Sequence, residues 1–334
     1  KTVRAALDQL ARTGMIEGPA AGSRRKIARQ QPAQSVLNQT ILIITYYDIP
    51  AVSGTFVGEG WDPNIIIHAM ATFCGRGLHT MTIDGHGLTF PKMRELLNER
   101  PCGVLVAFEC GEHEIGRAII EYCQTSGIPV VTYGYTPDSK TVLRLAADHA
   151  EGTRLLTEWA LAQGRQRPVL LWQGGKDTVW MQHREEGYVQ TMQSHGLEPE
   201  IFHAPSLDRD CRFEVDPAPV FKQESYLLAG YLADTFGDGF PDAMLVASDP
   251  FAFILNAALR ILGKEPNQQV LVLGYDHTYT QDVVHQRYEP TGPAATVDRE
   301  TSGIGRELAS LLLRLIDGEE LEGQLLHPPI LKVC

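Results

Sequence analysis

The chain has 334 residues, of which 43% are hydrophobic and 21% charged, and its formal net charge is -12. This composition is ordinary for a globular protein with room for two or three domains, and it excludes a disordered or collagen-like chain. No apolar run approaches the roughly 20 residues needed to cross a bilayer, and the basic beginning lacks the apolar stretch of an export signal. We therefore expect a cytoplasmic protein with no membrane partner. Six scattered cysteines without a C-x-x-C pair favour reduced thiols over a disulfide framework.

Positive charge is concentrated at the beginning of this acidic chain. Residues 1–31 hold seven Lys or Arg against two acidic residues. A short basic segment on an acidic body indicates a nucleic-acid-binding unit, because phosphate contacts need cations. A solvated basic tail is the alternative. The sequence starts with Lys1 rather than Met, so we expect the segment to begin partway through a larger unit.

The basic segment has a pattern of its own. Apolar residues recur at helical spacing from Val3 to Leu10, and Gly14 stands where such a helix would end, before the apolar pair Met15 and Ile16. The stretch GPAAGSRRKIA then joins turn-forming residues to three consecutive cations, as a hairpin tip on a phosphate backbone requires. We therefore predict an amphipathic helix, a strand and a basic hairpin.

This pattern resembles the recognition helix and wing of a GntR-type winged helix-turn-helix. The two helices that precede them in that unit have no counterpart in this chain. The resemblance implies that Thr2 and Arg4 face DNA from the recognition helix, and that Arg24, Arg25 and Lys26 contact it from the wing. A solvated helical arm is the alternative.

From residue 40 onward, short apolar strands alternate with amphipathic helices. Strands are predicted at 41–47, 79–84, 103–109, 128–134, 168–174, 242–248 and 269–276, with helices between them, for example at 114–127, 151–164 and 251–263. This alternation, with nearly continuous apolar strands, predicts an α/β fold with parallel sheets covered by helices on both faces. About ten strands are more than one compact core usually holds, so we expect two similar lobes.

Four blocks of this body carry a second resemblance. They are residues 148–174, 183–192, 242–278 and 295–318. In family order and spacing, they resemble the effector-binding core of LacI/GalR repressors, which has a periplasmic-binding-protein-like fold of two Rossmann-like lobes. The resemblance implies a ligand-responsive transcription regulator that binds operator DNA as a homodimer. The GntR-like head replaces the usual helix-turn-helix of that family, and segment 48–64 is longer than the family's loop after the first strand.

We divide the chain accordingly. The expected parts are a partial winged-helix DNA-binding domain (1–31), a linker (32–39) and an effector-binding domain (40–334). Within the last part, the expected N-lobe covers about 40–147 and 298–324, and the expected C-lobe covers about 148–297 and 325–334. Segments 293–318 and 327–333 would let the chain pass back between the lobes.

Candidate ligand residues stand at the carboxyl ends of the predicted strands, where open α/β sheets bind ligands. The polar and aromatic residues at those ends are Tyr46, Tyr47, Asp48, Asp84, Tyr133, Ser248, Asp249 and Asp276. The resemblance to the LacI/GalR family implies that Arg184 clamps effector hydroxyls or carboxylates and that Asp276 accepts from hydroxyls. It also matches Ser248 to the family's (N/S)D motif.

The candidate residues suit a small polyhydroxylated effector. A guanidinium at Arg184 facing Asp276 across a crevice would hold vicinal hydroxyls in one orientation. Trp180, one helical turn before Arg184, and the rings of Tyr47 and Tyr133 offer stacking faces for a sugar. We predict a sugar or sugar derivative; purines and other small metabolites remain open.

Each candidate has a purely structural alternative. Arg184 would then be a surface helix charge, and Asp276 would cap the segment that follows it. The rings of Trp180, Tyr47 and Tyr133 would pack in the core, as is favoured for Trp172 inside an apolar strand.

Enzyme and metal motifs do not stand out in the sequence. The nucleophile elbow G-x-S-x-G, the Walker motif and a complete dinucleotide fingerprint are missing from it. Cys110 and His113 lie in the stretch ECGEHE, but two ligands without a second pair favour a solvated loop. We therefore predict no enzyme, no cofactor and no metal site. A sugar-binding transport protein of the same fold is the alternative, and a two-lobed α/β enzyme is a more distant one.

Overall fold

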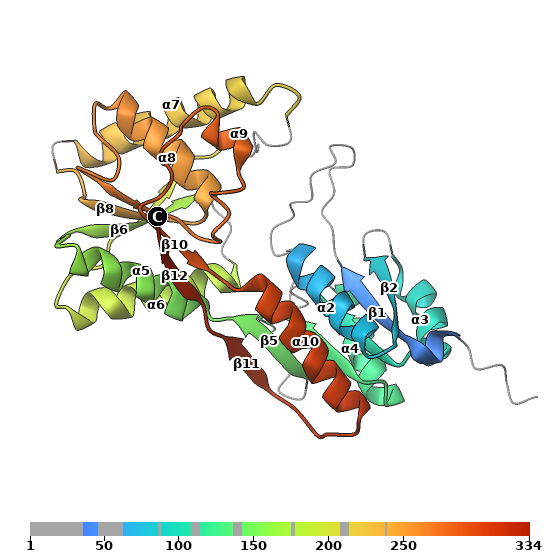
Figure 1. Ribbon diagram of the computed structural model, residues 1–334. Coiled ribbons are helices and arrows are strands. Elements are labelled where there is room, and N and C mark those ends of the chain that lie inside the picture. Colours follow the sequence, from blue (N-terminus) through green and yellow to red (C-terminus); the bar gives the residue numbers. More distant parts are fainter. Residues whose placement is uncertain are drawn as a thin grey trace, which may run out of the picture.

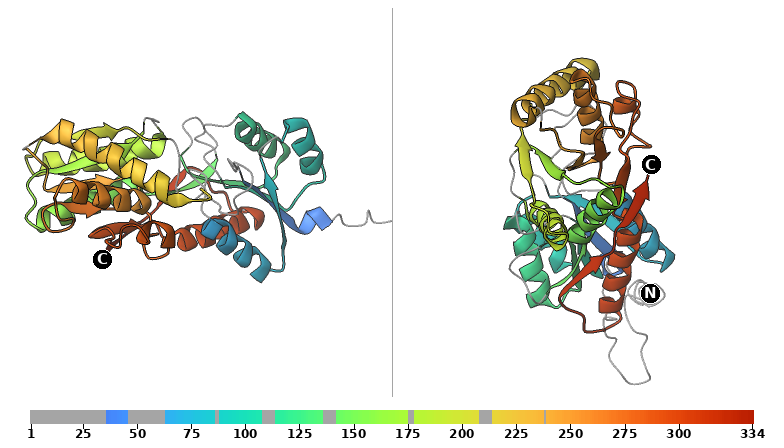
Figure 2. Two further views of the ribbon diagram at one scale, coloured as in Figure 1. Left: turned by 90° about the horizontal axis from the view of Figure 1, so that it is seen from above. Right: turned by 90° about the vertical axis from the view of Figure 1, so that its left-hand side faces the viewer.

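The structure is a computed structural model that describes residues 36–45, 63–85, 88–107, 114–135, 142–174, 178–207, 214–237 and 239–334. These residues form two α/β lobes, each built on a six-stranded sheet (Figure 1). In the view from above, the lobes follow one another along the long axis of the molecule (Figure 2). Within the described ranges, no helix is long and apolar enough to cross a membrane.

The first lobe has the strand order β11-β5-β4-β3-β1-β2, and all its strand pairs are parallel. Its strands are β1 (Thr40–Thr45), β2 (His79–Asp84), β3 (Gly103–Val106), β4 (Val130–Tyr133), β5 (Leu143–Ala147) and β11 (Gln324–His327). Its helices are the short η1 (Val36–Gln39), α2 (Pro63–Gly75), α3 (Phe90–Asn98), α4 (Glu114–Ser126) and α10 (Thr301–Ile316).

The continuous apolar run of β1 shows why this sheet is covered on both faces. Ile41 and Ile43 pack with α2 and α10, whereas Leu42 and Ile44 pack with α3 and α4. Since successive side chains of a strand point to opposite faces, both faces must be apolar.

The second lobe has the strand order β12-β10-β9-β8-β6-β7, and only its β10–β12 pair is antiparallel. Its strands are β6 (Pro168–Gln173), β7 (Ile201–Ala204), β8 (Ala243–Val246), β9 (Leu271–Leu273), β10 (Ala295–Asp298) and β12 (Ile330–Val333). Its helices are α5 (His149–Ala162), α6 (Val179–Ser194), α7 (Pro217–Phe236), α8 (Asp249–Ile261) and α9 (Val283–Gln286). In Figure 1, α5 and α6 cover one face of this sheet, and α7 and α8 cover the other.

The chain passes between the lobes three times, from β5 to α5, from β10 to α10 and from β11 to β12. The first lobe is predicted to end at about residue 324, but the whole of β11 pairs with β5 in the first sheet. The passage falls instead at Pro328 and Pro329, which lack the N–H groups that a ladder needs.

Two glycines let helices pack closely, one in each lobe. A Cβ atom on Gly187 of α6 would collide with the carbonyl oxygen of Ala150 on α5. A Cβ atom on Gly305 of α10 would collide with the carbonyl oxygen of Ile65 on α2. The two lobes therefore use the same device to bring their crossing helices together.

The expected fold class is confirmed, with two α/β lobes and parallel-dominated sheets. The seven predicted strands correspond to β1, β2, β3, β4, β6, β8 and β9. The basic segment 1–31, with the predicted DNA contacts of Thr2, Arg4, Arg24, Arg25 and Lys26, lies outside the described residues. Tyr47, Cys110 and His113 also lie outside them.

Candidate functional site

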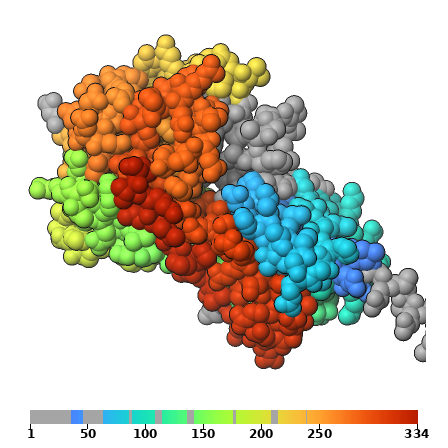
Figure 3. All heavy atoms as spheres, viewed as in Figure 1, coloured from blue at the N-terminus to red at the C-terminus, as the bar shows by residue number. Residues whose placement is uncertain are grey.

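Polar and aromatic side chains from both lobes meet at the lobe boundary. They come from the carboxyl ends of β4, β9 and β10, from the first turn of α5 and from the first two turns of α6. Figure 3 shows the two lobes as separate masses that adjoin along the red segments holding α10, β11 and β12. We call the group of Tyr133, His149, Trp180, Arg184, Tyr275, Asp276 and Arg299 the boundary cluster.

Arg184 is buried at the centre of this cluster rather than exposed on the surface of α6, since its side chain is only 5% exposed. Its Nε donates to Nδ1 of His149 at 3.2 Å, and its Nη1 donates to the carbonyl oxygen of Ala247 at 2.7 Å. Its Cζ lies 3.4 Å from the ring centroid of Tyr275 and 4.5 Å from that of Trp180. Two hydrogen bonds and two ring contacts therefore fix the guanidinium.

Asp276 stands between two arginines. Its Oδ1 lies 3.8 Å from Nη2 of Arg184 and 2.8 Å from Nε of Arg299. The residue has φ +87, in the left-handed region that Asp tolerates better than most residues. Its side chain is 23% exposed, and no hydrogen bond to Oδ2 is found in the part of the chain that the structure describes. A carboxylate oxygen held in place with spare acceptor capacity suits a ligand hydroxyl.

His149 is the first residue of α5, and it is buried, with 5% of the residue exposed. Burial lowers the pKa of this imidazole well below its ordinary value, and the neighbouring Arg184 lowers it further. Burial also raises the pKa of the Tyr275 phenol to about 12. Both groups are therefore neutral near pH 7 beside the cationic Arg184.

The first lobe contributes two tyrosines from the end of β4. The hydroxyl of Tyr133 accepts a long hydrogen bond of 3.5 Å from Nη1 of Arg299. Tyr135 stacks on the ring of His183 from α6, with centroids 4.2 Å apart, and its hydroxyl donates to the carbonyl oxygen of Ala147. These contacts connect the first lobe to the residues on either side of the Arg184–Asp276 pair.

The remaining sequence candidates lie outside the cluster or at its edge. Ser248 accepts a hydrogen bond from the backbone N–H of Phe251 and caps α8, directly after Ala247. Asp84 ends β2, which β1 and β3 separate from β4. Trp172 is buried in the core and donates to Glu185 at 2.7 Å, as the core interpretation predicts.

Asp249 supports the loop that carries Asp276. Its Oδ2 accepts from the backbone N–H groups of Thr278 at 2.7 Å and Tyr279 at 3.0 Å, and its Oδ1 accepts from the hydroxyl of Thr296 at 2.7 Å. Burial raises the pKa of Asp249 to about 7, although these hydrogen bonds oppose the rise. Asp249 is a ligand candidate by its position at a strand end, whereas its contacts are those of a structural support.

Sequence reasoning missed four residues of this region. Tyr135, Tyr275, His149 and Arg299 all contact the predicted residues or their neighbours. A polar residue just beyond a strand end is the signal that could have singled out Arg299, and the first turn of a helix that follows a strand could have singled out His149.

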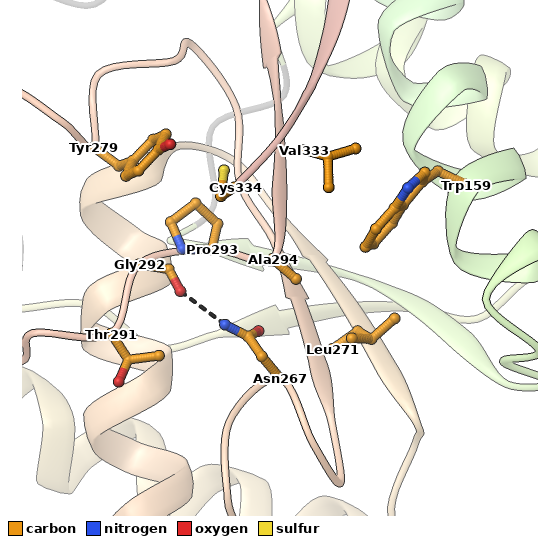
Figure 4. A pocket seen from close by; sticks show the side chains of 10 residues that line it. All are labelled: Trp159, Asn267, Leu271, Tyr279, Thr291, Gly292, Pro293, Ala294, Val333 and Cys334. Carbon is orange, nitrogen blue, oxygen red and sulfur yellow. Dashed lines mark hydrogen bonds between the residues drawn. The ribbon is translucent and has the colours of Figure 1, made fainter.

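A separate pocket of about 500 Å³ lies at the amino ends of β9 and β10 (Figure 4). It is lined by Trp159, Asn267, Leu271, Tyr279, Thr291, Gly292, Pro293, Ala294, Val333 and Cys334. Two of its polar groups already have partners: Asn267 donates to the carbonyl oxygen of Gly292 at 2.9 Å, and the hydroxyl of Thr291 accepts from Arg260, outside the pocket, at 2.7 Å. None of the predicted site residues lines this pocket.

Within the described ranges, no group of three or more His, Cys, Asp or Glu could hold a metal ion.

Two parallel-sheet lobes with three crossings and a polar cluster at their boundary define a two-lobed binding-protein fold. The sequence matches the family described as periplasmic binding protein-like domain over residues 157–333. Residues 65–218 match the periplasmic binding proteins and sugar binding domain of the LacI family. The first match covers more than half of the chain, which therefore belongs to the periplasmic binding protein-like domain family.

Similar proteins include several regulators. The HTH-type transcriptional regulator CelR of Thermobifida fusca is 28% identical over 200 residues, which are 59% of this chain and 53% of CelR. The chain thus spans about half the length of this curated relative.

Solved structures show the same fold. The complex of a transcriptional regulator CelR with cellobiose has a TM-score of 0.66 at 20% identity and covers 88% of this chain and 83% of its own. A regulatory protein of the LacI family from Chloroflexus aggregans has a TM-score of 0.65 at 19% identity, with coverages of 88% and 97%. The lac repressor dimer bound to operator and the anti-inducer ONPF has a TM-score of 0.62 at 21% identity, with coverages of 89% and 93%.

Proposed function

We propose that this chain is a ligand-responsive DNA-binding transcription regulator whose two-lobed core binds a sugar or sugar derivative as its effector. The observation that carries the proposal is the boundary cluster, in which Arg184 and Asp276 are fixed at the carboxyl ends of the strands. The structurally similar complex of a transcriptional regulator CelR with cellobiose supports the choice of a sugar. The proposal assigns no catalytic residue and places the protein in the cytoplasm.

The proposed mechanism starts from the contacts around Asp276. Effector hydroxyls donate to Oδ2 of Asp276 and accept from Nη2 of Arg184, the guanidinium nitrogen nearest to Asp276. Trp180 stacks against the sugar ring. Arg299 contacts both Asp276 and Tyr133. An effector that shifts Asp276 therefore also changes the contact between Arg299 and Tyr133, which connects the two lobes. One lobe orientation is thereby stabilised, and the DNA affinity changes by a coupling free energy of typically ~1 to 3 kcal/mol.

The proposed regulator acts as a homodimer. Both lobes carry exposed apolar side chains that a partner subunit could cover: Ile67 on α2, Met81 on β2, Tyr226 on α7 and Val283 on α9. The lac repressor of similar fold is a dimer on its operator. Sedimentation velocity on the protein should give the mass of a dimer, and a monomer at micromolar concentration would contradict this part of the proposal.

A thermal-shift panel tests the effector. Cellobiose, other disaccharides, monosaccharides and nucleobases are each added to the wild type, and a true effector stabilises the folded state by ~2.7 kcal/mol at 100 times its Kd. Arg184→Met should abolish that stabilisation, measured against the variant's own ligand-free melting temperature. The matched control is Arg154→Met, because Arg154 is an exposed arginine on α5 paired with Glu151.

The outcomes of this panel separate the candidate effectors. A nucleobase that shifts the melting temperature while every sugar fails would replace the sugar by a purine. An unchanged shift in Arg184→Met would remove Arg184 from the site.

DNA binding tests the regulator against a transport protein of the same fold. Thr2, Arg4, Arg24, Arg25 and Lys26 are the proposed contacts of a GntR-like winged helix. Fluorescence anisotropy with a nonspecific duplex should show steep salt dependence, and the triple replacement of Arg24, Arg25 and Lys26 by Ala should reduce the log-log salt slope by about one for each lost phosphate contact. A protein that binds a sugar and no duplex would favour transport.

A further inference from the structure

His149 occupies a junction between the two lobes and the boundary cluster. It follows directly on the passage from β5 to α5, and Asp148 caps the helix by accepting from the backbone N–H of Glu151 at 2.9 Å. The imidazole lies about 6 Å, centroid to centroid, from three rings, those of Tyr135 at 5.9 Å, Tyr275 at 5.9 Å and Trp180 at 6.1 Å.

The hydrogen bond to Arg184 defines the protonation state of this ring. A guanidinium has donors and no acceptor, so Nδ1 of His149 must offer a lone pair to Nε of Arg184. The proton of the neutral ring is then on Nε2. A doubly protonated imidazole would place two cations in contact and leave the Nε–H group of Arg184 without an acceptor.

The ring contacts alone do not orient the guanidinium. The faces of Tyr275 and Trp180 fix its plane but allow it to turn within that plane. The bonds from Nε to His149 and from Nη1 to the Ala247 carbonyl remove that freedom. The remaining edge, Nη2, then faces Asp276.

We propose that His149 is the positioning residue of the effector site: its neutral imidazole holds the Arg184 guanidinium with Nη2 directed at Asp276. This role rests on the proposed function, because it assigns His149 to the same site. His149 does not touch the effector in this account and acts through Arg184.

Protonation of His149 would break this arrangement. The titratable or charged groups that face it are Arg184 and His183 from α6, Tyr135 after β4, Tyr275 after β9 and Arg299 after β10. Burial and the two arginines lower the pKa of His149, so effector affinity should be constant near neutral pH and fall only in acid.

The first experiment needs no effector and uses nitrogen-15 NMR of the intact wild type. We expect a pyridine-like Nδ1 and a protonated Nε2 on His149, together with a slowly exchanging Nε–H of Arg184, whose signal is identified by its loss in Arg184→Lys. A proton on Nδ1 of His149 at neutral pH would overturn the proposal. Because the wild type is measured, a variant that fails to fold does not affect this result.

The second experiment compares two substitutions of His149. His149→Asn keeps an acceptor near the position of Nδ1, and His149→Ala removes it. We expect the Arg184 Nε–H signal to stay protected in the Asn variant and to exchange rapidly in the Ala variant. A protected signal in His149→Ala would overturn the proposal.

Effector affinity completes the test, with the sugar that the thermal-shift panel identifies. His149→Ala should weaken its Kd about tenfold or more, as for the loss of a hydrogen bond to a charged group, while His149→Asn should restore most of the affinity. His195→Ala is the control, because His195 is an exposed histidine paired with Glu158. Equal affinities of the Ala and Asn variants would contradict the positioning role. If no sugar binds, the proposed function fails, whereas the NMR result still decides whether His149 holds Arg184.

Discussion

The two lobes share one architecture and differ in what they bury. The first lobe encloses a nearly apolar core, and its described buried polar residues are Thr40, Thr45, Thr132 and Arg144. The second lobe buries His149, Arg184, Glu224, Asp249, Asn256, Asp282, His285 and Glu289, along with several hydroxyl side chains. Buried charges require partners that hold them. The second lobe is therefore the one that fixes the charges of the site, and the first supplies rings and hydroxyls that contact them.

The shared architecture predicts equal sensitivity at the two helix crossings. Gly187→Ala and Gly305→Ala each force a Cβ atom into a backbone carbonyl of the neighbouring helix, so each should lower the free energy of unfolding by about 1 to 3 kcal/mol or more. Urea denaturation measures this loss. The control is Gly230→Ala on α7, where the added Cβ meets nothing within 4 Å and Ala should stabilise the helix by up to ~1 kcal/mol. A Gly305→Ala variant as stable as the Gly230→Ala control would contradict the prediction that the two helix crossings are equally sensitive.

The polar interior of the second lobe predicts a sharp dependence on one carboxyl group. Asp249→Ala leaves the N–H groups of Thr278 and Tyr279 without their acceptor, which should cost about 2 to 3 kcal/mol of stability. Asp249→Asn keeps an oxygen for these N–H groups and should cost less than half as much. Chemical denaturation of both variants measures the difference. Equal losses would contradict this prediction, because Asn keeps both the volume of Asp and an oxygen for these N–H groups.

A pH dependence of stability should arise at His149. Its pKa is lowered well below 6.5 in the fold, so between the two values the unfolded chain binds the additional proton. The free energy of unfolding should therefore fall as the pH drops below 6.5, by up to about 1.4 kcal/mol per pH unit. Above pH 6.5 this contribution is complete. Denaturation of wild type and His149→Asn at several pH values isolates it, and parallel pH profiles would contradict the assignment.

The opposite sign applies to Asp249, whose pKa rises from 3.8 to about 7. Here the folded state binds the additional proton, so this contribution is present below 3.8 and is lost as the pH rises through about 7. His149→Asn and Asp249→Asn should therefore change the pH dependence of the free energy of unfolding in opposite directions. The contributions of the two residues can be told apart by this sign.

The smallest expected losses of stability concern Tyr133 and Tyr135, the tyrosines of the first lobe that lie at the lobe boundary. The long contact between Tyr133 and Arg299 predicts a loss near 0.5 kcal/mol for Tyr133→Phe. Tyr135 donates a shorter, buried hydrogen bond of 2.6 Å to Ala147, so Tyr135→Phe should cost about 1 to 1.5 kcal/mol. Thermal unfolding of the pair, with wild type alongside, gives the ranking, and the reverse ranking would show that Arg299 depends on Tyr133 more than its geometry indicates.

Much of the fold could be predicted because apolar periodicity reflects local geometry. The run at β1 is buried throughout, as its pattern requires, and the helix predicted at 251–263 forms as α8. The end of the first lobe was misplaced because β11 is exposed at Leu325 and Leu326 and its pairing with the distant β5 leaves no local signal. Register and long-range strand pairing depend on contacts that periodicity does not contain.

The site was partly predictable for a related reason. Arg184 and Asp276 lie 3.8 Å apart within the second lobe, rather than facing each other across a crevice as predicted. Arg299 and His149 were missed because a polar residue after a strand and a histidine at a helix start are common in loops and caps. These residues gain their contacts only where five separate segments of the chain meet.

The most direct test of the account is a crystal structure with the sugar that the thermal-shift panel selects. The account predicts ligand density at the lobe boundary, with a hydroxyl within about 3.2 Å of Oδ2 of Asp276 and the sugar ring beside Trp180. Density in the pocket beside Trp159, with the boundary cluster untouched, would contradict it.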